Sequence, residues 1–192
     1  MKLVLPLTIA TLISSLSLAS AETDGTQMPV QNAGFEEPFM TVPAPNPAKK
    51  AQITGMLVDG WSDNSDWADI SVDYSKDTDN PHGGQSSQKV DVTRVDSGAV
   101  QVTQKVEFRA NHQYIFRIWM RGTPGTVVSM QLRKASEPYT TYALKDARLS
   151  EEWQEYTVTG GVTDDTPGFL LLLANRPMTF WIDDAELADL TK

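Results

Sequence analysis

The chain has 192 residues, a formal net charge of −9 and no cysteine. The negative charge argues against nucleic acid or an anionic membrane as a partner, because both bind clustered lysine and arginine side chains. Without disulfides, stability must come from the core or from a metal, and a chain of this length can bury a sizeable core as one domain.

The first 21 residues have the features of a cleaved signal peptide. Lys2 precedes an apolar run over residues 3–18, and Ala19-Ser20-Ala21 supplies the small residues that signal peptidase recognises. The run is short for a membrane span. We therefore expect a secreted protein, extracellular or periplasmic, with no membrane segment in its mature form. Residues 22–28 are interpreted as a short polar linker, and residues 29–192 as a single domain.

Beyond the leader, apolar and polar residues alternate with a period of two, which is typical of strands. The clearest strand is 113–121, where Tyr114, Phe116, Ile118 and Met120 share one face. Further strands are expected over residues 70–74, 89–93, 100–108, 127–134, 153–159, 169–174 and 180–187. Residues 38–50, which include Pro43, Pro45 and Pro47, are expected to form a surface loop. With no helical segment of ten or more residues, the pattern predicts an all-β fold, a sandwich or barrel of antiparallel strands.

Signatures of catalysis are mostly missing from the sequence. There is no cysteine nucleophile and no Gly-x-Ser-x-Gly elbow, and the two histidines lack the spacing of a zinc protease. The loop that starts at Asp63 is not an EF-hand, because Ala68 replaces the required glycine and Tyr74 the required glutamate. Two carboxylates that meet only in space can still hydrolyse a glycosidic bond. A small polysaccharide-degrading enzyme therefore stays an alternative.

Three separated segments carry a more specific signal: Asn32-Ala-Gly-Phe-Glu36, Pro81-His-Gly-Gly-Gln-Ser-Ser87 and Phe180-Trp-Ile-Asp-Asp184. Together with Gly60-Trp61 and the strand 113–121, they resemble the carbohydrate-binding modules of the family 4/9 type. Such modules are galactose-binding-like jelly rolls attached to xylanases, glucanases and related hydrolases. The resemblance extends from about residue 29 to residue 187. It implies a non-catalytic carbohydrate-binding domain, free-standing or the N-terminal module of a glycoside hydrolase.

The resemblance also implies a structural Ca²⁺ ion. Carried over to this sequence, its ligands would be the carbonyl groups of Gly34, His82 and Gln85 and the carboxylates of Glu36 and Asp183. Two carboxylates and three carbonyls form the oxygen-rich set that Ca²⁺ prefers. In the alternative interpretation, the two acidic residues are ordinary residues at strand ends.

Sugar rings stack on aromatic side chains, and their hydroxyl groups bond to arginine and amide side chains. The face of strand 113–121 opposite the core carries Arg117, Trp119 and Arg121. The next strand along the chain carries Gln131 and Arg133 at matching positions, and we expect it to lie beside the first. Aromatic candidates outside the strands are Trp67, Tyr139 and Tyr142.

These residues predict a polysaccharide ligand, a β-glycan such as xylan or β-glucan. Some xylan-binding members of the family carry a tryptophan just before the strand that begins here near Val100, whereas this chain has only Ser97-Gly-Ala99. That departure weakens a specific assignment to xylan. The alternative from another class is a galactose-binding-like adhesion or assembly domain that contacts protein.

Overall fold

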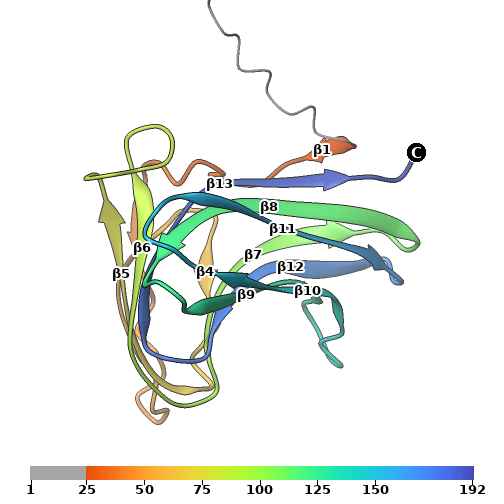
Figure 1. Ribbon diagram of the computed structural model, residues 1–192. Coiled ribbons are helices and arrows are strands. Elements are labelled where there is room, and N and C mark those ends of the chain that lie inside the picture. Colours follow the sequence, from red (N-terminus) through yellow and green to blue (C-terminus); the bar gives the residue numbers. More distant parts are fainter. Residues whose placement is uncertain (1–24) are drawn as a thin grey trace, which may run out of the picture.

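The structure is a computed structural model that describes residues 25–192, so the expected signal peptide, residues 1–21, lies outside the described residues. The described chain forms strands β1 to β13 in two sheets that pack face to face as a jelly-roll sandwich (Figure 1). This confirms the expected fold class. None of the described residues belongs to a helix long and apolar enough to cross a membrane.

The larger sheet has eight strands. In spatial order they are β11 (Gln154–Val162), β8 (His112–Gly122), β13 (Met178–Asp189), β6 (Ser87–Ser97), β5 (Asp69–Asp77), β3 (Gln52–Val58) and β2 (Phe39–Thr41), while β1 (Thr26–Met28) pairs with β13. Neighbouring strands are antiparallel except for β3 and β5, which run parallel. The first and last strands are therefore direct neighbours, with Thr26 opposite Asp189 (Figure 1).

The smaller sheet has five strands, all antiparallel. Their spatial order is β10 (Thr141–Arg148), β9 (Val127–Lys134), β12 (Thr166–Ala174), β7 (Val100–Phe108) and β4 (Ser62–Asp63). Strand β12 lies between β9 and β7, as its continuous apolar sequence predicted. Leu171 is fully buried although it points away from the space between the sheets, and its neighbours in the strand register, Thr103 and Gln131, are nearly buried too.

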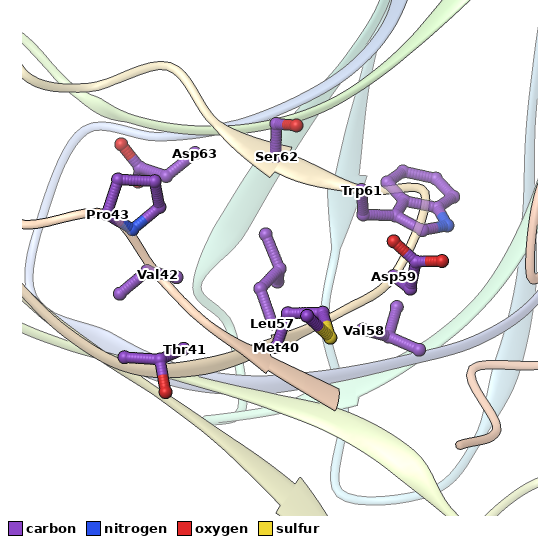
Figure 2. A pocket seen from close by; sticks show the side chains of 10 residues that line it. All are labelled: Met40, Thr41, Val42, Pro43, Leu57, Val58, Asp59, Trp61, Ser62 and Asp63. Atoms are coloured by element: carbon purple, nitrogen blue, oxygen red, sulfur yellow. The ribbon is translucent and has the colours of Figure 1, made fainter. Parts of the chain in front are cut away.

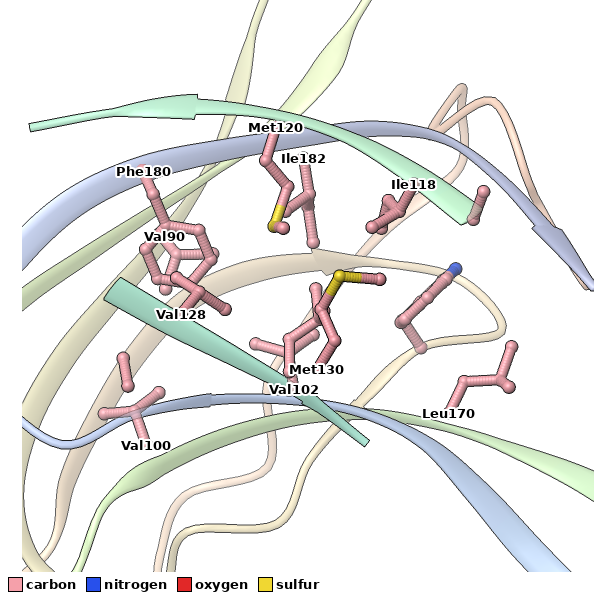
Figure 3. Close-up of a cluster of buried hydrophobic side chains, with 14 of the residues drawn as sticks. Val90, Val100, Val102, Ile118, Met120, Val128, Met130, Leu170, Phe180 and Ile182 are labelled. Carbon is pink, nitrogen blue, oxygen red and sulfur yellow. The ribbon is translucent and has the colours of Figure 1, made fainter. Parts of the chain in front are cut away.

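The core fills the space between the two sheets. From the larger sheet, alternate residues of β8 from Tyr114 to Met120 are fully buried, as the alternation predicted. They meet the inward residues of β9 and β12, and Figure 3 shows Met120 and Ile182 opposite Met130 and Val102. The branched and aromatic residues at these positions favour extended strands, and their burial is the main stabilising contribution.

Four segments differ from the sequence-based expectations. Residues 26–28 belong to the expected linker but form β1, paired with the last strand. Residues 39–41 lie within the expected loop 38–50 and form the edge strand β2. Strands β3 and β10 were not anticipated, because Gly55 interrupts the first and exposed Leu144 and Lys145 obscure the period of the second.

The expected adjacency of strands β8 and β9 is wrong. They follow one another in the chain, but β8 pairs with β11 and β13, whereas β9 pairs with β10 and β12 in the opposite sheet. The chain crosses from one sheet to the other at the turn around Gly125, whose φ of +79° suits glycine. As a result, Gln131 and Arg133 lie on a different outer face from Arg117 and Trp119.

The burial pattern predicts different effects for the same substitution at two leucines. Leu170 on β12 is fully buried, so Leu170→Ala should lower the free energy of unfolding by about 3 kcal/mol through lost contacts and a cavity. Leu144 on β10 is 57% exposed, and Leu144→Ala should change it by less than about 0.5 kcal/mol. Urea unfolding of both variants measures the difference, and equal losses would contradict the assigned strand faces.

Candidate functional site

A groove of about 490 Å³ opens on the outer face of the smaller sheet. Three of the expected sugar-binding residues meet there from distant parts of the sequence: Trp67, Arg133 and Tyr139. The remaining lining residues are Asn64, Asp66, Gln101, Ala135 and Phe169. Strands β7, β9 and β12 form the floor, because Gln101, Arg133 and Phe169 all point away from the core.

The two aromatic rings of the groove are held in place yet exposed. Trp67 is 54% exposed, while its indole N–H donates to the carbonyl oxygen of Asn64 at 2.9 Å. Tyr139 is 45% exposed, and its carbonyl oxygen accepts a bond from Nε of Arg133 at 3.3 Å. Large exposed aromatic side chains with fixed geometry are typical of ligand-binding surfaces, because little conformational entropy is lost on binding.

Trp67 also lies beside the loop 97–99 before β7, a loop that has no aromatic residue of its own. A Cβ atom added to Gly98 would lie 2.7 Å from Cζ3 of Trp67, so the indole ring lies directly against the short loop before β7. The φ of Gly98 is +82°, which further favours glycine. The loop before β7 is therefore covered by an aromatic ring that comes from another segment of the chain.

Polar groups next to these rings suit a ligand rich in hydroxyl groups. Nδ2 of Asn64 donates to Oε1 of Gln101 at 2.9 Å, which orients both amides at the groove. Gln131, another predicted residue, is nearly buried on the same face and lies opposite Leu144 and Leu171 in the strand register. Paired amide and hydroxyl groups of this kind can exchange hydrogen bonds with sugar hydroxyls.

The structure places three predicted sugar-binding residues on the outer face of the larger sheet, where they contact other protein groups. The Trp119 ring stacks on the His82 ring, with centroids 3.8 Å apart. Arg117 forms an ion pair with Glu186 at 3.0 Å. Arg121 lies 4.0 Å from the centroid of Trp181 and also pairs with Asp77. These three side chains therefore do not join the groove.

Tyr142 lies elsewhere again, packed against the core. Its ring meets Phe108 edge to face, and its hydroxyl donates to Asp164 at 2.9 Å. Desolvation, followed by this bond to the carboxylate, raises the pKa of Tyr142 to about 12. Tyr142 therefore packs at the edge of the sandwich. Of the two tyrosines, Tyr139 is the one that lines the groove.

A second hollow of about 270 Å³ lies between the edges of the two sheets, beside β2, β3 and β4. Its walls are mainly apolar, formed by Met40, Val42, Leu57 and Trp61 (Figure 2). It contains none of the predicted sugar-binding residues. Its apolar lining suits hydroxyl groups less well than the groove, which therefore stays the better candidate for a sugar ligand.

The five predicted calcium ligands converge at one place. Asp183, fully buried, accepts backbone N–H bonds from His82 at 2.9 Å and Gly83 at 3.2 Å. Glu36 accepts bonds from the backbone N–H groups of Gln85 at 2.6 Å and Ser86 at 3.3 Å. Gly34 lies against the neighbouring carboxylate of Asp184. Three segments that are far apart in the sequence thus meet around carboxylate oxygens.

The backbone at this junction adopts unusual conformations. Asn32, Phe35 and Asp184 have positive φ angles of 44°, 51° and 43°. Asn32 holds the first turn closed, because its Nδ2 donates to the carbonyl oxygen of Glu36 and its Oδ1 accepts from the Glu36 N–H. Left-handed conformations at residues other than glycine cost free energy and commonly mark functional or ligand-binding segments.

The side chains of Glu36 and Asp183 place negative charge at this junction. Within residues 25–192, neither Glu36 nor Asp183 forms an ion pair, and burial raises the pKa of Asp183 to about 6 against the opposing effect of the Gly83 N–H. The described residues contain no group of three or more His, Asp or Glu side chains arranged as metal ligands. A cation bound here would need oxygen ligands in addition to these carboxylates, and the carbonyl ligands stay a prediction.

Asp184 is a residue of this junction that the sequence interpretation missed. Its Oδ2 lies 2.6 Å from Nδ1 of His82. The same carboxylate would lie 2.5 Å from a Cβ atom at Gly83, so a larger residue there would displace the Asp184 side chain. The sequence shows two consecutive aspartates in the last strand, and only the first, Asp183, was predicted as a calcium ligand. His82 thus contributes its ring to the junction as well as its backbone.

The fold and the groove define a β-sandwich with an open, aromatic-lined binding surface, and comparison with known proteins places it in a family. A family model described as a carbohydrate-binding domain (CBM_4_9) matches residues 30–171. The chain belongs to this family of carbohydrate-binding domains, as its sequence motifs indicated. No curated protein matches the chain.

Solved structures share the same fold at low sequence identity. A family 4 carbohydrate-binding module superposes with a TM-score of 0.60 and 14% identity, covering 84% of this chain and 99% of that module. The xylan-binding domain CBM22-1 of Xyn10C from Paenibacillus barcinonensis gives 0.55 and 9%, with coverages of 83% and 92%. The C-terminal family 22 module of Xyn10B from Clostridium thermocellum gives 0.53 and 16%, with coverages of 69% and 87%.

Two glycines provide a test of the Glu36 contact. A Cβ atom at Gly84 would lie 1.8 Å from Oε1 of Glu36, whereas one at Gly125 would meet only Arg148, at 3.9 Å. Both glycines have positive φ angles, so an alanine strains the backbone at either position by about 1–2 kcal/mol. Gly84→Ala should therefore lower the free energy of unfolding by about 2 kcal/mol more than Gly125→Ala. Equal losses in thermal or urea unfolding would refute the contact.

Proposed function

We propose that the groove between Trp67 and Tyr139 is the glycan-binding site and that the domain binds polysaccharide without cleaving it. The observation that carries the proposal is the pair of exposed, anchored aromatic rings beside the amide groups of Asn64 and Gln101. Sugar C–H faces stack on such rings, while amides exchange hydrogen bonds with the hydroxyl groups. Family membership supports a carbohydrate ligand. The likeness to xylan-binding modules makes β-glycans the first class to test.

The charges in the groove support binding rather than hydrolysis. Most glycoside hydrolases need two carboxyl groups on either side of the bond that breaks. The lining residues in the described part of the chain include one carboxylate, Asp66, and its Oδ2 lies 2.8 Å from Nζ of Lys49. A single carboxylate cannot supply both of the groups that this mechanism uses.

We propose further that Ca²⁺ binds at the junction of Glu36, Asp183 and the loop 82–85. Three observations support it: uncompensated carboxylates, a cradle in which a Cβ atom at Gly83 or Gly84 would collide with a carboxylate, and left-handed backbone on both sides. The ion would neutralise the buried charge and tie the first loop, the loop before β6 and the last strand together. Its role would be structural. Export through the predicted signal peptide is part of the same proposal, since Ca²⁺ is abundant outside cells.

The sugar site is tested by affinity electrophoresis in gels that contain xylan, β-glucan, mannan, laminarin or agarose. The protein should be retarded in at least one gel. In that gel, Trp67→Ala and Tyr139→Ala should each weaken binding about 30-fold, the loss of about 2 kcal/mol that is usual for a stacking aromatic residue. Trp119→Phe serves as the control, because it keeps a ring against His82 on the opposite sheet.

Unchanged affinity in both alanine variants would remove the groove as the binding site, and a loss in Trp119→Phe would move the site to the larger sheet. No retardation of the wild-type protein in any gel would overturn carbohydrate binding by this chain and favour an adhesion domain that contacts protein.

The calcium proposal is tested by thermal unfolding with and without EGTA. A hundredfold excess of Ca²⁺ over its Kd should add about 2.7 kcal/mol to the free energy of unfolding. For a chain of this size, that gain raises the midpoint by about 5–10 °C. The Asp183→Asn and Glu36→Gln variants should lose this response, and Mg²⁺ should not replace Ca²⁺ because it requires a stricter octahedral geometry. An unchanged midpoint after chelation would refute the site.

A further inference from the structure

Two cationic side chains flank an aromatic ring on the floor of the groove. In the strand register, Phe169 of β12 lies opposite Arg133 of β9 on one side and Lys105 of β7 on the other. Residues directly opposite in neighbouring strands point to the same face of a sheet. Arg133, Phe169 and Lys105 therefore form a row across three strands, which we call the cationic row. Arg133 and Phe169 line the groove, and Lys105 is exposed beside them.

The charges of the cationic row are not compensated by the protein. Within residues 25–192, neither Arg133 nor Lys105 forms an ion pair with a carboxylate, whereas the arginines of the opposite face, Arg117 and Arg121, both do. The chain as a whole carries a net charge of −9, so acidic partners are plentiful elsewhere on its surface. A local excess of positive charge on an acidic protein creates a potential that attracts an anionic ligand.

No acidic residue of the described chain forms an ion pair with the cationic row. Asp66 lines the same groove but is paired with Lys49 at 2.8 Å. Glu107 is two residues beyond Lys105 on the same face of β7, opposite Pro167 near the start of β12, and like Lys105 it is exposed and does not line the groove. Asp164 is paired with Lys134 at 3.5 Å. The unpaired charge inside the groove is therefore positive.

Arg133 is already positioned to bind an anion. Its Nε donates to the carbonyl oxygen of Tyr139, and its guanidinium carbon lies 5.2 Å from the centroid of the Tyr139 ring. These two contacts fix the plane of the guanidinium group next to a ring on which a sugar can stack. The terminal N–H groups of such a fixed arginine form paired hydrogen bonds with a carboxylate or a sulfate.

We propose that the groove selects acidic polysaccharides, whose sugar rings carry carboxylate or sulfate groups. The proposal rests on the proposed function and specifies its ligand class. A sugar stacked on Tyr139 or Phe169 presents its anionic substituent to Arg133, and Lys105 contributes to the attraction from the far side of the row. The selectivity is electrostatic, so it weakens as the salt concentration rises.

The test uses polymers that differ only in charge. Glucuronoxylan and polygalacturonan are compared with the same polymers after carboxyl reduction, and a sulfated galactan with its desulfated form. Binding is measured by isothermal titration calorimetry with the mature protein. At low salt, at least one acidic polymer should bind ten times more tightly than its neutral derivative, and 0.5 M NaCl should reduce this ratio. A preference in the uronic acid pairs identifies carboxylate as the anion, and one in the galactan pair identifies sulfate.

Variants of the cationic row should remove the preference. Arg133→Gln and Lys105→Gln should each bring the affinity for the acidic polymer close to that for its neutral derivative, and Lys105→Gln should leave binding of the neutral derivative unchanged. Arg133→Lys should retain part of the preference, because it keeps the charge and loses the paired hydrogen bonds. Arg176→Gln, in the exposed turn between β12 and β13, makes the same charge change away from the groove and should have no effect. Lys105 is exposed, so its variant tests the proposal even where Arg133→Gln impairs folding.

The outcomes separate this proposal from the proposed function. Equal binding of the acidic polymers and their neutral derivatives would overturn the charge preference and leave glycan binding intact. A preference that survives in Arg133→Gln and Lys105→Gln would also overturn it, because the anion would then be bound elsewhere. No binding of any polymer would refute the proposed function itself.

Discussion

Burial of one face of every central strand is the constraint on which the rest of the structure depends. Because one face of each strand packs into the core, its outer residues lie on the outer surface of the sheet that the strand joins. Strands β8 and β9 illustrate the consequence, since their inward residues meet in the core while their outer residues lie on opposite sides of the molecule. The groove belongs to the smaller sheet because β9, β12 and β7 present Arg133, Phe169 and Gln101 together.

The two candidate sites carry charge of opposite sign in different surroundings. At the junction of Glu36 and Asp183 the charge is negative, partly or fully buried, and held against backbone N–H groups. Burial strengthens electrostatic interactions over short distances, which suits a small cation of high charge density. In the groove the charge is positive and reachable from solvent, so it acts on a large ligand and is screened by salt. In the proposals above, the first site would support the architecture and the second would recognise the ligand.

Sequence alone predicted the strands with strong alternation, because a period of two over residues such as Tyr114 to Met120 has no other common structural explanation. It also predicted the convergence of Glu36, His82 and Asp183, through motifs whose order is shared with a known family. The sequence did not predict which of the two sheets each strand joins. Consecutive strands usually pair, and no feature of residues 122–126 indicates that the chain crosses to the other sheet there. The grouping of Trp67 with Tyr139 was hidden for the same reason, since both come from irregular loops placed only by tertiary packing.

The pairing of β1 with β13 has a consequence for the connectivity of the domain. Thr26 and Asp189 are opposite each other in one sheet, so a few added residues would join the two ends of the sandwich without crossing its surface. A chain closed there could be reopened at the turn around Gly125, where the chain changes sheets and an added Cβ atom has space. The order of strands along the chain is thus separable from their order in space. A circular permutant opened in this turn would keep the groove on one side and the carboxylate junction on the other.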